Sequence, residues 1–155
     1  MDAISIRLAK PDERLALEEL QRRASLVWED YREALLANPD AIALPESHVA
    51  EGRVLVAEVH GDLLGFAVVL PRADGGAELD GMFVEPTCWR GGIGRALIFH
   101  AQQAASKNGA HSLHVIANPR ALGFYEKCGF VEEGRAETRF GPGITMRKPL
   151  PLRHA

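Results

Sequence analysis

Cysteine and long apolar runs are scarce in this sequence. Among its 155 residues only two are cysteines, Cys88 and Cys128, too few for the disulfide framework of a small secreted protein. The N-terminus carries no apolar segment of the signal-peptide kind, and no stretch stays apolar for long enough to cross a bilayer. We therefore expect neither a signal peptide nor a transmembrane helix, and we predict a cytoplasmic protein.

An excess of positive charge is also lacking. The 18 Lys and Arg residues face 21 Asp and Glu, and the resulting formal net charge of −3 argues against a nucleic-acid or membrane partner. The apolar share of 46% and the charged share of 25% are ordinary for a globular protein. At this length, residues 1–155 are expected to form a single domain.

The apolar pattern predicts an alternation of strands and helices. Strand-like segments are expected at residues 4–8, 53–59, 63–70, 77–84, 112–117, 130–134 and 144–148. One helix is expected to start at residue 11, and a second helix or its continuation is expected to run to the break at 38–39. Two further helices are expected, from about 92 to 107 and over 118–128. Residues 39–52 are left as a loop or a short helix, and Gly65 suggests a bulge in the second hairpin strand.

One strand is followed by a glycine-rich turn. Pro86 stops the strand, Gly91, Gly92 and Gly94 follow, and Arg95 lies in the first turn of the next helix. Glycines allow a ligand to approach closely, and the first N–H groups of a helix have no intrahelical partner, so this arrangement favours a phosphate or pyrophosphate. A tight turn with no ligand is the alternative for this element taken alone.

Two common phosphate motifs do not fit this turn. Arg95 stands where a P-loop needs Lys followed by Ser or Thr, and Leu97 stands where a dinucleotide fingerprint needs its third glycine. A second segment, residues 118–130, begins with the good N-cap Asn118 and the helix-starting Pro119, and Gly129 is typical of a helix end.

In their order and spacing these two segments resemble the GNAT superfamily of acyl-CoA-dependent N-acetyltransferases. The matching positions are Val84, Pro86, Gly92 and Gly94 in the first and Asn118, Ala121, Phe124, Tyr125, Gly129 and Phe130 in the second. The resemblance covers residues 77–131 and implies an α/β fold with a central, mixed, mostly antiparallel sheet of about six to seven strands and helices on both faces. Trp89 departs from the family, which has Gln or Arg there.

The resemblance implies acetyl-CoA as the acyl donor. The residues implied in binding it are Met82, Phe83, Val84, Arg90, Gly91, Gly92, Ile93, Gly94, Arg95, Ala96, Asn118 and Tyr125. Main-chain N–H groups of the glycine turn are expected to hold the pyrophosphate, and the strand residues to pair with the pantetheine arm. Because Trp89 replaces the family's polar side chain, Arg90 and Arg95 are the candidates for a side-chain contact.

Three residues are candidates for the chemistry. Glu78 and Asp80 lie two apart on a strand and so share a face. The resemblance implies Glu78 as the general base, with Asp80 as a second position where some members place one. It also implies Tyr125 as the acid that protonates the departing thiolate. Whether Glu78, Asp80 or water takes the proton is left open.

We therefore predict an N-acetyltransferase that transfers acetyl directly to a primary amine of a small molecule. A protein N-terminal or lysine acetyltransferase is the alternative enzyme, and a non-catalytic acyl-CoA-binding module is the alternative of another class. His111 and His114 have no acid or cysteine cluster beside them, so no metal is expected. The acceptor, a small-molecule amine or a peptide, and the oligomeric state, including a homodimer, stay open.

Overall fold

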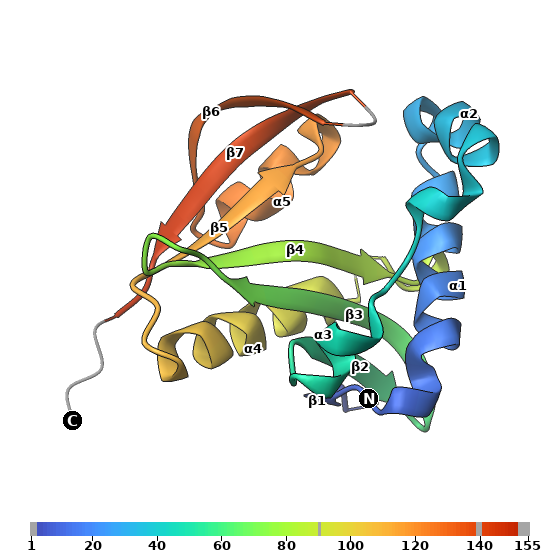
Figure 1. Ribbon diagram of the computed structural model, residues 1–155, viewed down its shortest axis with the longest axis horizontal. Coiled ribbons are helices and arrows are strands. Elements are labelled where there is room, and N and C mark those ends of the chain that lie inside the picture. The colour runs from blue at the N-terminus through green and yellow to red at the C-terminus, as the bar shows by residue number, and fades with distance from the viewer. Residues whose placement is uncertain (1–2, 90, 139–140, 152–155) are drawn as a thin grey trace. The chain divides into compact units, whose positions relative to one another are not determined.

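A mixed β-sheet dominates the structure. The computed structural model describes residues 3–89, 91–138 and 141–151, without the side chains of residues 29–31 and 39. Within this described part, seven strands follow the order β1-β2-β3-β4-β5-β7-β6 (Figure 1). Their bounds are β1 Ser5–Leu8, β2 Val54–Val59, β3 Asp62–Pro71, β4 Ala77–Val84, β5 Ser112–Ala117, β6 Val131–Thr138 and β7 Gly141–Pro149. The predicted α/β fold class is confirmed.

Five α-helices are described along the chain. They are α1 Arg14–Leu26, α2 Glu29–Ala37, α3 Glu46–Ala50, α4 Ile93–Lys107 and α5 Leu122–Lys127, joined in places by single 3-10 turns. The undecided segment 39–52 contains the short helix α3. Asn38 ends α2, as its position before a proline predicts.

The chain divides into two compact units. The first contains Met1–Val68 and Gly81–Leu97, and the second contains Val69–Asp80 and Ile98–Ala155. In the first, β1, β2 and β3 pair in antiparallel fashion. In the second, β4 runs parallel to β5, while β5–β7 and β6–β7 are antiparallel.

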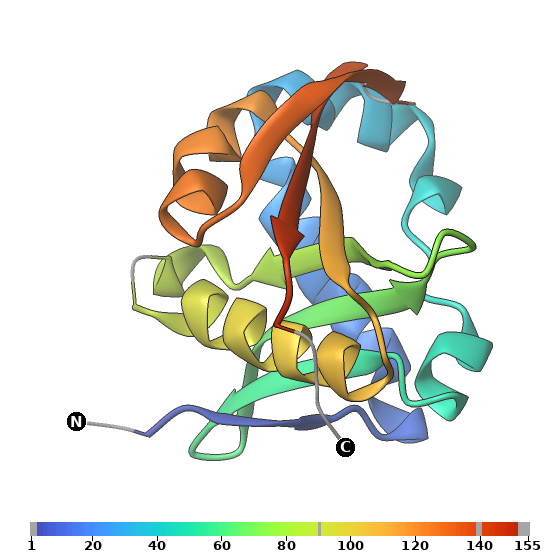
Figure 2. The same ribbon diagram turned by 90° about the vertical axis from the view of Figure 1, so that its left-hand side faces the viewer.

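The core of the first unit lies around β2 and β3. Figure 2 shows α1 behind these strands and the beginning of α4 in front of them. Gly65 permits this approach, because a Cβ there would lie 3.1 Å from Ile93 Cγ2 and 3.2 Å from Leu97 Cδ1. The register shifts between Ala57 and Glu58, where Gly65 pairs, which confirms the predicted bulge.

In the second unit, β5 lies between two strands. Its apolar residues Leu113 and Val115 are buried, as are Leu79 of β4 and Met146 of β7. Each such side chain contributes roughly 1.5–3 kcal/mol on burial. The strand therefore holds a fixed register, and its alternate residues, among them His114, lie on the opposite face. No helix in the described part of the chain is long and apolar enough to cross a membrane.

Candidate active site

The glycine turn in the first unit has the geometry of an anion site. Gly92 has a φ of +85°, a backbone conformation that favours glycine. Apart from its chain neighbours, no atom of the described residues would lie within 4 Å of a Cβ added there. The first helical bond runs from the Ala96 N–H to the Gly92 carbonyl at 3.0 Å. The N–H groups of Ile93, Gly94 and Arg95 therefore precede the first hydrogen bond of α4.

Trp89 connects this turn to its surroundings within the first unit. Its indole Nε1–H donates to the Val84 carbonyl at 2.9 Å, and its ring stacks on Trp28 with centroids 5.4 Å apart. The residue that departs from the family pattern thus braces the turn, while 38% of its surface stays exposed. Arg90, a candidate for the pyrophosphate contact, lies outside the described residues; Arg95 is exposed in the first turn of α4.

The end of β4 that leads to the turn is well anchored. Glu85 accepts a bidentate contact from Arg23 of α1, with distances of 3.0 and 2.7 Å, and its N–H donates to the Leu64 carbonyl at 2.8 Å. Phe83 packs on Phe66 at a centroid distance of 5.3 Å. Bidentate pairs of this kind fix geometry as well as charge.

The parallel pairing of β4 with β5 is short. It covers Ala77, Glu78 and Leu79, three of the eight residues of β4. Met82, Phe83 and Val84, the residues predicted to pair with the pantetheine arm, are half-buried and lie beyond that paired stretch. The backbone of this part of β4 is thus the candidate for an added strand-like partner.

Asn118 combines a confirmed cap with an unused donor. Its Oδ1 accepts from the Arg120 N–H at 2.9 Å and caps the 3-10 turn Pro119–Ala121, which precedes α5. Its Nδ2 is buried and has no hydrogen-bond partner among the residues that the structure describes. A buried donor without a partner costs about 1–3 kcal/mol, so this atom calls for an acceptor from a ligand or water.

Tyr125 of α5 is buried in an aromatic cluster. Only 7% of it is exposed, and its ring meets Phe124 and Phe130 edge to face at 5.2 and 5.5 Å. Burial, and next the Cys128 thiol, raise the pKa of the Tyr125 hydroxyl above its ordinary value. The hydroxyl therefore stays protonated at neutral pH and is available as a donor.

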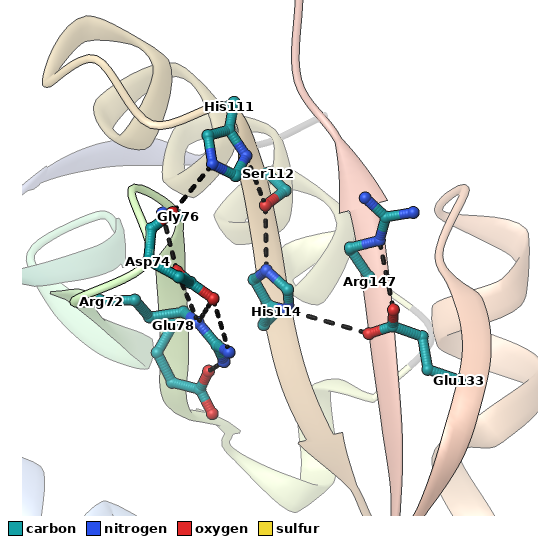
Figure 3. Close-up of polar contacts among 9 residues, drawn as sticks. All are labelled: Arg72, Asp74, Gly76, Glu78, His111, Ser112, His114, Glu133 and Arg147. Carbon is teal, nitrogen blue, oxygen red and sulfur yellow. Dashed lines mark hydrogen bonds and ion pairs between the residues drawn. The ribbon is translucent and has the colours of Figure 1, made fainter.

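The two candidate carboxylates differ in their surroundings. Glu78 is half-buried on β4 and accepts a 2.7 Å hydrogen bond from Arg72, whereas Asp80 is exposed. Arg72 also binds Asp74, and this contact together with the Gly76 N–H lowers the pKa of Asp74 to about 2. Asp74 and, to a smaller extent, Glu78 raise the pKa of Arg72. Figure 3 shows Arg72 between them.

Beside Glu78 lies a group of polar residues that the sequence analysis did not assign to the site. His114 stands opposite Glu78 in the strand register, and its ring contacts Ser112 Oγ at 2.9 Å and Glu133 at 3.8 Å. Arg147 contacts the same Glu133 at 3.3 Å (Figure 3). The i, i+2 spacing of Ser112 and His114 on a strand is the signal that would have placed them on one face.

These residues surround a small pocket in the second unit. Its volume is about 130 Å³, and it is lined by Arg72, Glu78, His114, Val115, Ile116, Glu133, Thr145 and Met146. Burial, and next the charge of Arg72, lower the pKa of His114, which leaves the imidazole neutral at pH 7. The lining thus carries two carboxylates against one guanidinium. In the described residues no group of three or more His, Cys, Asp or Glu could hold a metal ion.

The sequence matches a known protein family. The model of the acetyltransferase (GNAT) family matches residues 15–130. The chain belongs to the GNAT family. This member of the GNAT family is 34% identical to peptidyl-lysine N-acetyltransferase YjaB of Escherichia coli over 77 residues, 50% of the chain and 48% of the relative. The match therefore spans about half the length of that relative.

Two further relatives cover more of the GNAT chain. IAA acetyltransferase of Azospirillum brasilense is 32% identical over 108 residues, 63% of this chain and 68% of the relative. The PaiA N-acetyltransferase of Thermoplasma acidophilum, solved in complex with coenzyme A, superposes with a TM-score of 0.77 at 22% identity, over 95% of this chain and 99% of that one. The last likeness is one of fold.

Proposed function

We propose that this acetyltransferase transfers an acetyl group from acetyl-CoA directly to the primary amine of a small molecule. The observation that carries the proposal is the turn at Gly92, where a glycine with positive φ leaves open space at its Cβ position directly before the first turn of α4. Because the family model spans parts of both units, we also propose that the chain works as one acetyltransferase domain.

Several residues fit coenzyme A. The N–H groups of Ile93, Gly94 and Arg95 and the positive end of the α4 dipole suit a pyrophosphate, and the Arg95 side chain adds a positive charge. Met82–Val84 would pair with the amide groups of the pantetheine arm, with the Val84 carbonyl already accepting from Trp89. In the second unit, the Nδ2 of Asn118, which has no partner among the described residues, suits a carbonyl oxygen of a ligand.

The pocket beside Glu78 is the proposed acceptor site. Its excess of carboxylate over guanidinium favours a cationic or neutral amine over an acid. Its volume of about 130 Å³ is small beside ordinary ligand pockets of roughly 300–1,000 Å³. It therefore suits the amine end of a substrate and a few neighbouring atoms.

The chemistry that these residues supply is direct transfer. Glu78 and Asp80 attract and orient the ammonium group, and the sequence-based hypothesis makes Glu78 the base as well. The protonated hydroxyl of Tyr125 donates to the leaving sulfur. No covalent intermediate on the protein is required, since the deprotonated amine attacks the thioester itself.

Release of free thiol tests the function. Purified protein is mixed with acetyl-CoA and a panel of polyamines, aminoglycosides, amino acids and lysine-containing peptides. We expect thiol release and an acetylated product with at least one small-molecule amine. Binding of coenzyme A with no transfer to any member of the panel would contradict the proposal and indicate a binding module.

A peptide lysine is the second candidate acceptor. The observation that favours it is the 34% identity to a relative named peptidyl-lysine N-acetyltransferase. Turnover confined to the peptides of the panel, with acetyl-lysine identified by mass spectrometry, would favour this acceptor over a small molecule.

The change Glu78→Gln is expected to weaken use of the amine and not of acetyl-CoA. The substitution removes a negative charge from the acceptor pocket and one of the two carboxylates that bind Arg72. A hydrogen bond to a charged group contributes roughly 1.5–3 kcal/mol, so kcat/KM for the amine should fall at least about tenfold. Calorimetry should give an unchanged Kd for coenzyme A, and Glu46→Gln, at an exposed residue of α3, is the control. A wild-type kcat/KM in Glu78→Gln would remove Glu78 from the site.

A further inference from the structure

One carboxylate oxygen of Glu78, the residue predicted as the base, already accepts a hydrogen bond. Its Oε2 accepts from Arg72 Nη1 at 2.7 Å, and the same guanidinium is fixed by Asp74. That oxygen is therefore already engaged as a hydrogen-bond acceptor for a guanidinium that is held in place. The next residue across the register is His114, which lines the same pocket.

Hydrogen-bond directions identify which nitrogen of His114 is basic. His111 Nε2 lies 3.1 Å from the Asp74 carbonyl, which only accepts, so this nitrogen carries a hydrogen. In a neutral His111 the Nδ1 is then an acceptor, and the Ser112 hydroxyl, 3.1 Å away, must donate to it. Ser112 Oγ consequently accepts from His114 Nε2 at 2.9 Å. With both imidazoles neutral, His114 holds its hydrogen on Nε2 and a lone pair on Nδ1.

The series of hydrogen bonds that sets this tautomer is formed by residues with fixed positions. Ser112 is 1% exposed at the start of β5, and the Asp74 carbonyl belongs to the turn that Arg72 and the Gly76 N–H brace. Figure 3 shows the series from the turn through His111 and Ser112 to His114, with Glu133 beyond it. The Nδ1 atom lies 3.8 Å from Glu133 Oε1, so a proton gained there forms an ion pair.

We propose that Nδ1 of His114 is the base that takes the proton from the acceptor amine, with Ser112 and His111 as positioning residues that hold its tautomer. The inference rests on the proposed function. It shifts the base from the carboxylate of Glu78 to the imidazole opposite it, and it leaves Glu78 the task of attracting the ammonium group.

The step balances without any further reactant. The ammonium nitrogen gives a proton to Nδ1, its lone pair forms the C–N bond to the acetyl carbon, and the C–S bond breaks with its electrons on sulfur. The thiolate is stabilised by a hydrogen bond from Tyr125. It becomes free thiol by taking, through that hydroxyl, the second proton, which the nitrogen loses as the amide forms. Glu133 stabilises the imidazolium until the proton leaves to water.

The charges around His114 decide its response to pH. Arg72, which follows β3, disfavours the imidazolium, and Arg147 of β7 is paired with Glu133. Three carboxylates favour the imidazolium instead: Asp74 of the turn, Glu133 of β6 and Glu78 of β4. Burial is the largest effect and favours the neutral ring. Activity should therefore fall as pH drops through and below the ordinary imidazole range, about 6.5.

The tautomer can be measured without any turnover. In the full-length protein with ¹⁵N-labelled histidine, the His114 ring, assigned by its loss in His114→Gln, should show a protonated Nε2 and an unprotonated Nδ1 at pH 7.5. In Ser112→Ala the preference should weaken, because the acceptor for Nε2–H is gone. A hydrogen found on Nδ1 in the wild type would overturn the proposal.

Kinetics then test the role. His114→Gln places an amide N–H where Nε2–H stood, so the contact to Ser112 is kept and only the basic nitrogen is lost. We expect kcat to fall at least about 100-fold, the lower end for general-base catalysis, with loss of the acidic limb of the pH–rate profile and an unchanged Kd for coenzyme A. Glu78→Gln should keep that limb, and His100→Gln, an imidazole of α4 outside the pocket lining, should match the wild type.

The possible failures are distinguishable. If His114→Gln keeps the wild-type rate and limb while Glu78→Gln loses the limb, the base is Glu78 and the proposal is overturned. If the wild-type protein transfers acetyl to no amine, the proposed function fails and the role of His114 fails with it. Transfer that survives His114→Gln unchanged overturns the role of His114 alone.

Discussion

Replacing Gly92 by valine should abolish binding of coenzyme A. Gly92 has a φ of +85°, a conformation that costs a β-branched residue about 1–3 kcal/mol. Its missing Cβ also leaves space that no protein atom fills within 4 Å, which is where the pyrophosphate is proposed to lie. Affinity measured by calorimetry should fall at least about 100-fold, or roughly 2.8 kcal/mol at about 1.4 kcal/mol per decade.

Gly61 provides a matched control for this change. It lies in the turn between β2 and β3, has a φ of +83°, and a Cβ there would also meet nothing within 4 Å. Gly61→Val should therefore bring a similar backbone strain and a similar loss of thermal stability, yet leave the affinity for coenzyme A intact. Gly94→Val, in the first turn of α4, should weaken binding as Gly92→Val does. Unchanged affinity in both folded turn variants would rule out this site.

The change Tyr125→Phe should slow the transfer while keeping the fold. The phenyl ring retains the edge-to-face packing on Phe124 and Phe130 and loses only the hydroxyl. Protonation or a strong hydrogen bond to a leaving group contributes typically 10²–10⁴-fold. We expect kcat to fall at least about tenfold, with the melting temperature and the Kd for coenzyme A near their wild-type values.

A series of acyl donors separates the chemical role of Tyr125 from packing. A free thiol has a pKa of about 8.5, and donors with more acidic thiols depend less on help to the leaving group. Their rates should therefore suffer less from Tyr125→Phe. Equal impairment with every thiol, or none, would show that the tyrosine serves packing.

The pH dependence of Tyr125 follows from its raised pKa. Burial holds the hydroxyl protonated beyond its ordinary pKa of about 10, so its ionisation should cause no loss of rate between pH 7 and 10. The native state also binds this proton more tightly than the unfolded chain does. The free energy of unfolding is therefore unaffected below pH 10 and falls above it, and Tyr125→Phe should reduce that alkaline loss in a thermal scan.

Local sequence signals predicted the elements that hold the site. Strand β4 at Ala77–Val84 and strand β5 at Ser112–Ala117 have the bounds that their apolar pattern indicated. The glycine turn, the Asn118 cap and the stop at Gly129, whose φ is +96°, follow from the conformational preferences of single residues. Such features depend on neighbours in sequence, so one chain is enough to predict them.

Strand ends set by pairing were predicted less well. The expected strand 144–148 extends in the structure to Gly141 because its glycine and proline residues pair with β6 over Ala136–Thr138. Neither glycine nor proline favours a strand by itself. Pairing with the partner strand overrides that weak preference, and the residues of the segment do not indicate which strand they pair with.

The sequence by itself determined the family, the order of strands and helices, and the glycine turn, because each depends on residue types and their spacing along the chain. Only the tertiary structure decided that Arg72 donates a hydrogen bond to Glu78 and that Ser112 orients His114 beside Glu133. It also decided that Trp89 stacks on Trp28. These contacts join residues up to 61 positions apart, as Trp28 and Trp89 show. Hydrogen bonds and ring contacts act over a few ångströms, so the charge and tautomer of a side chain follow from its neighbours in space.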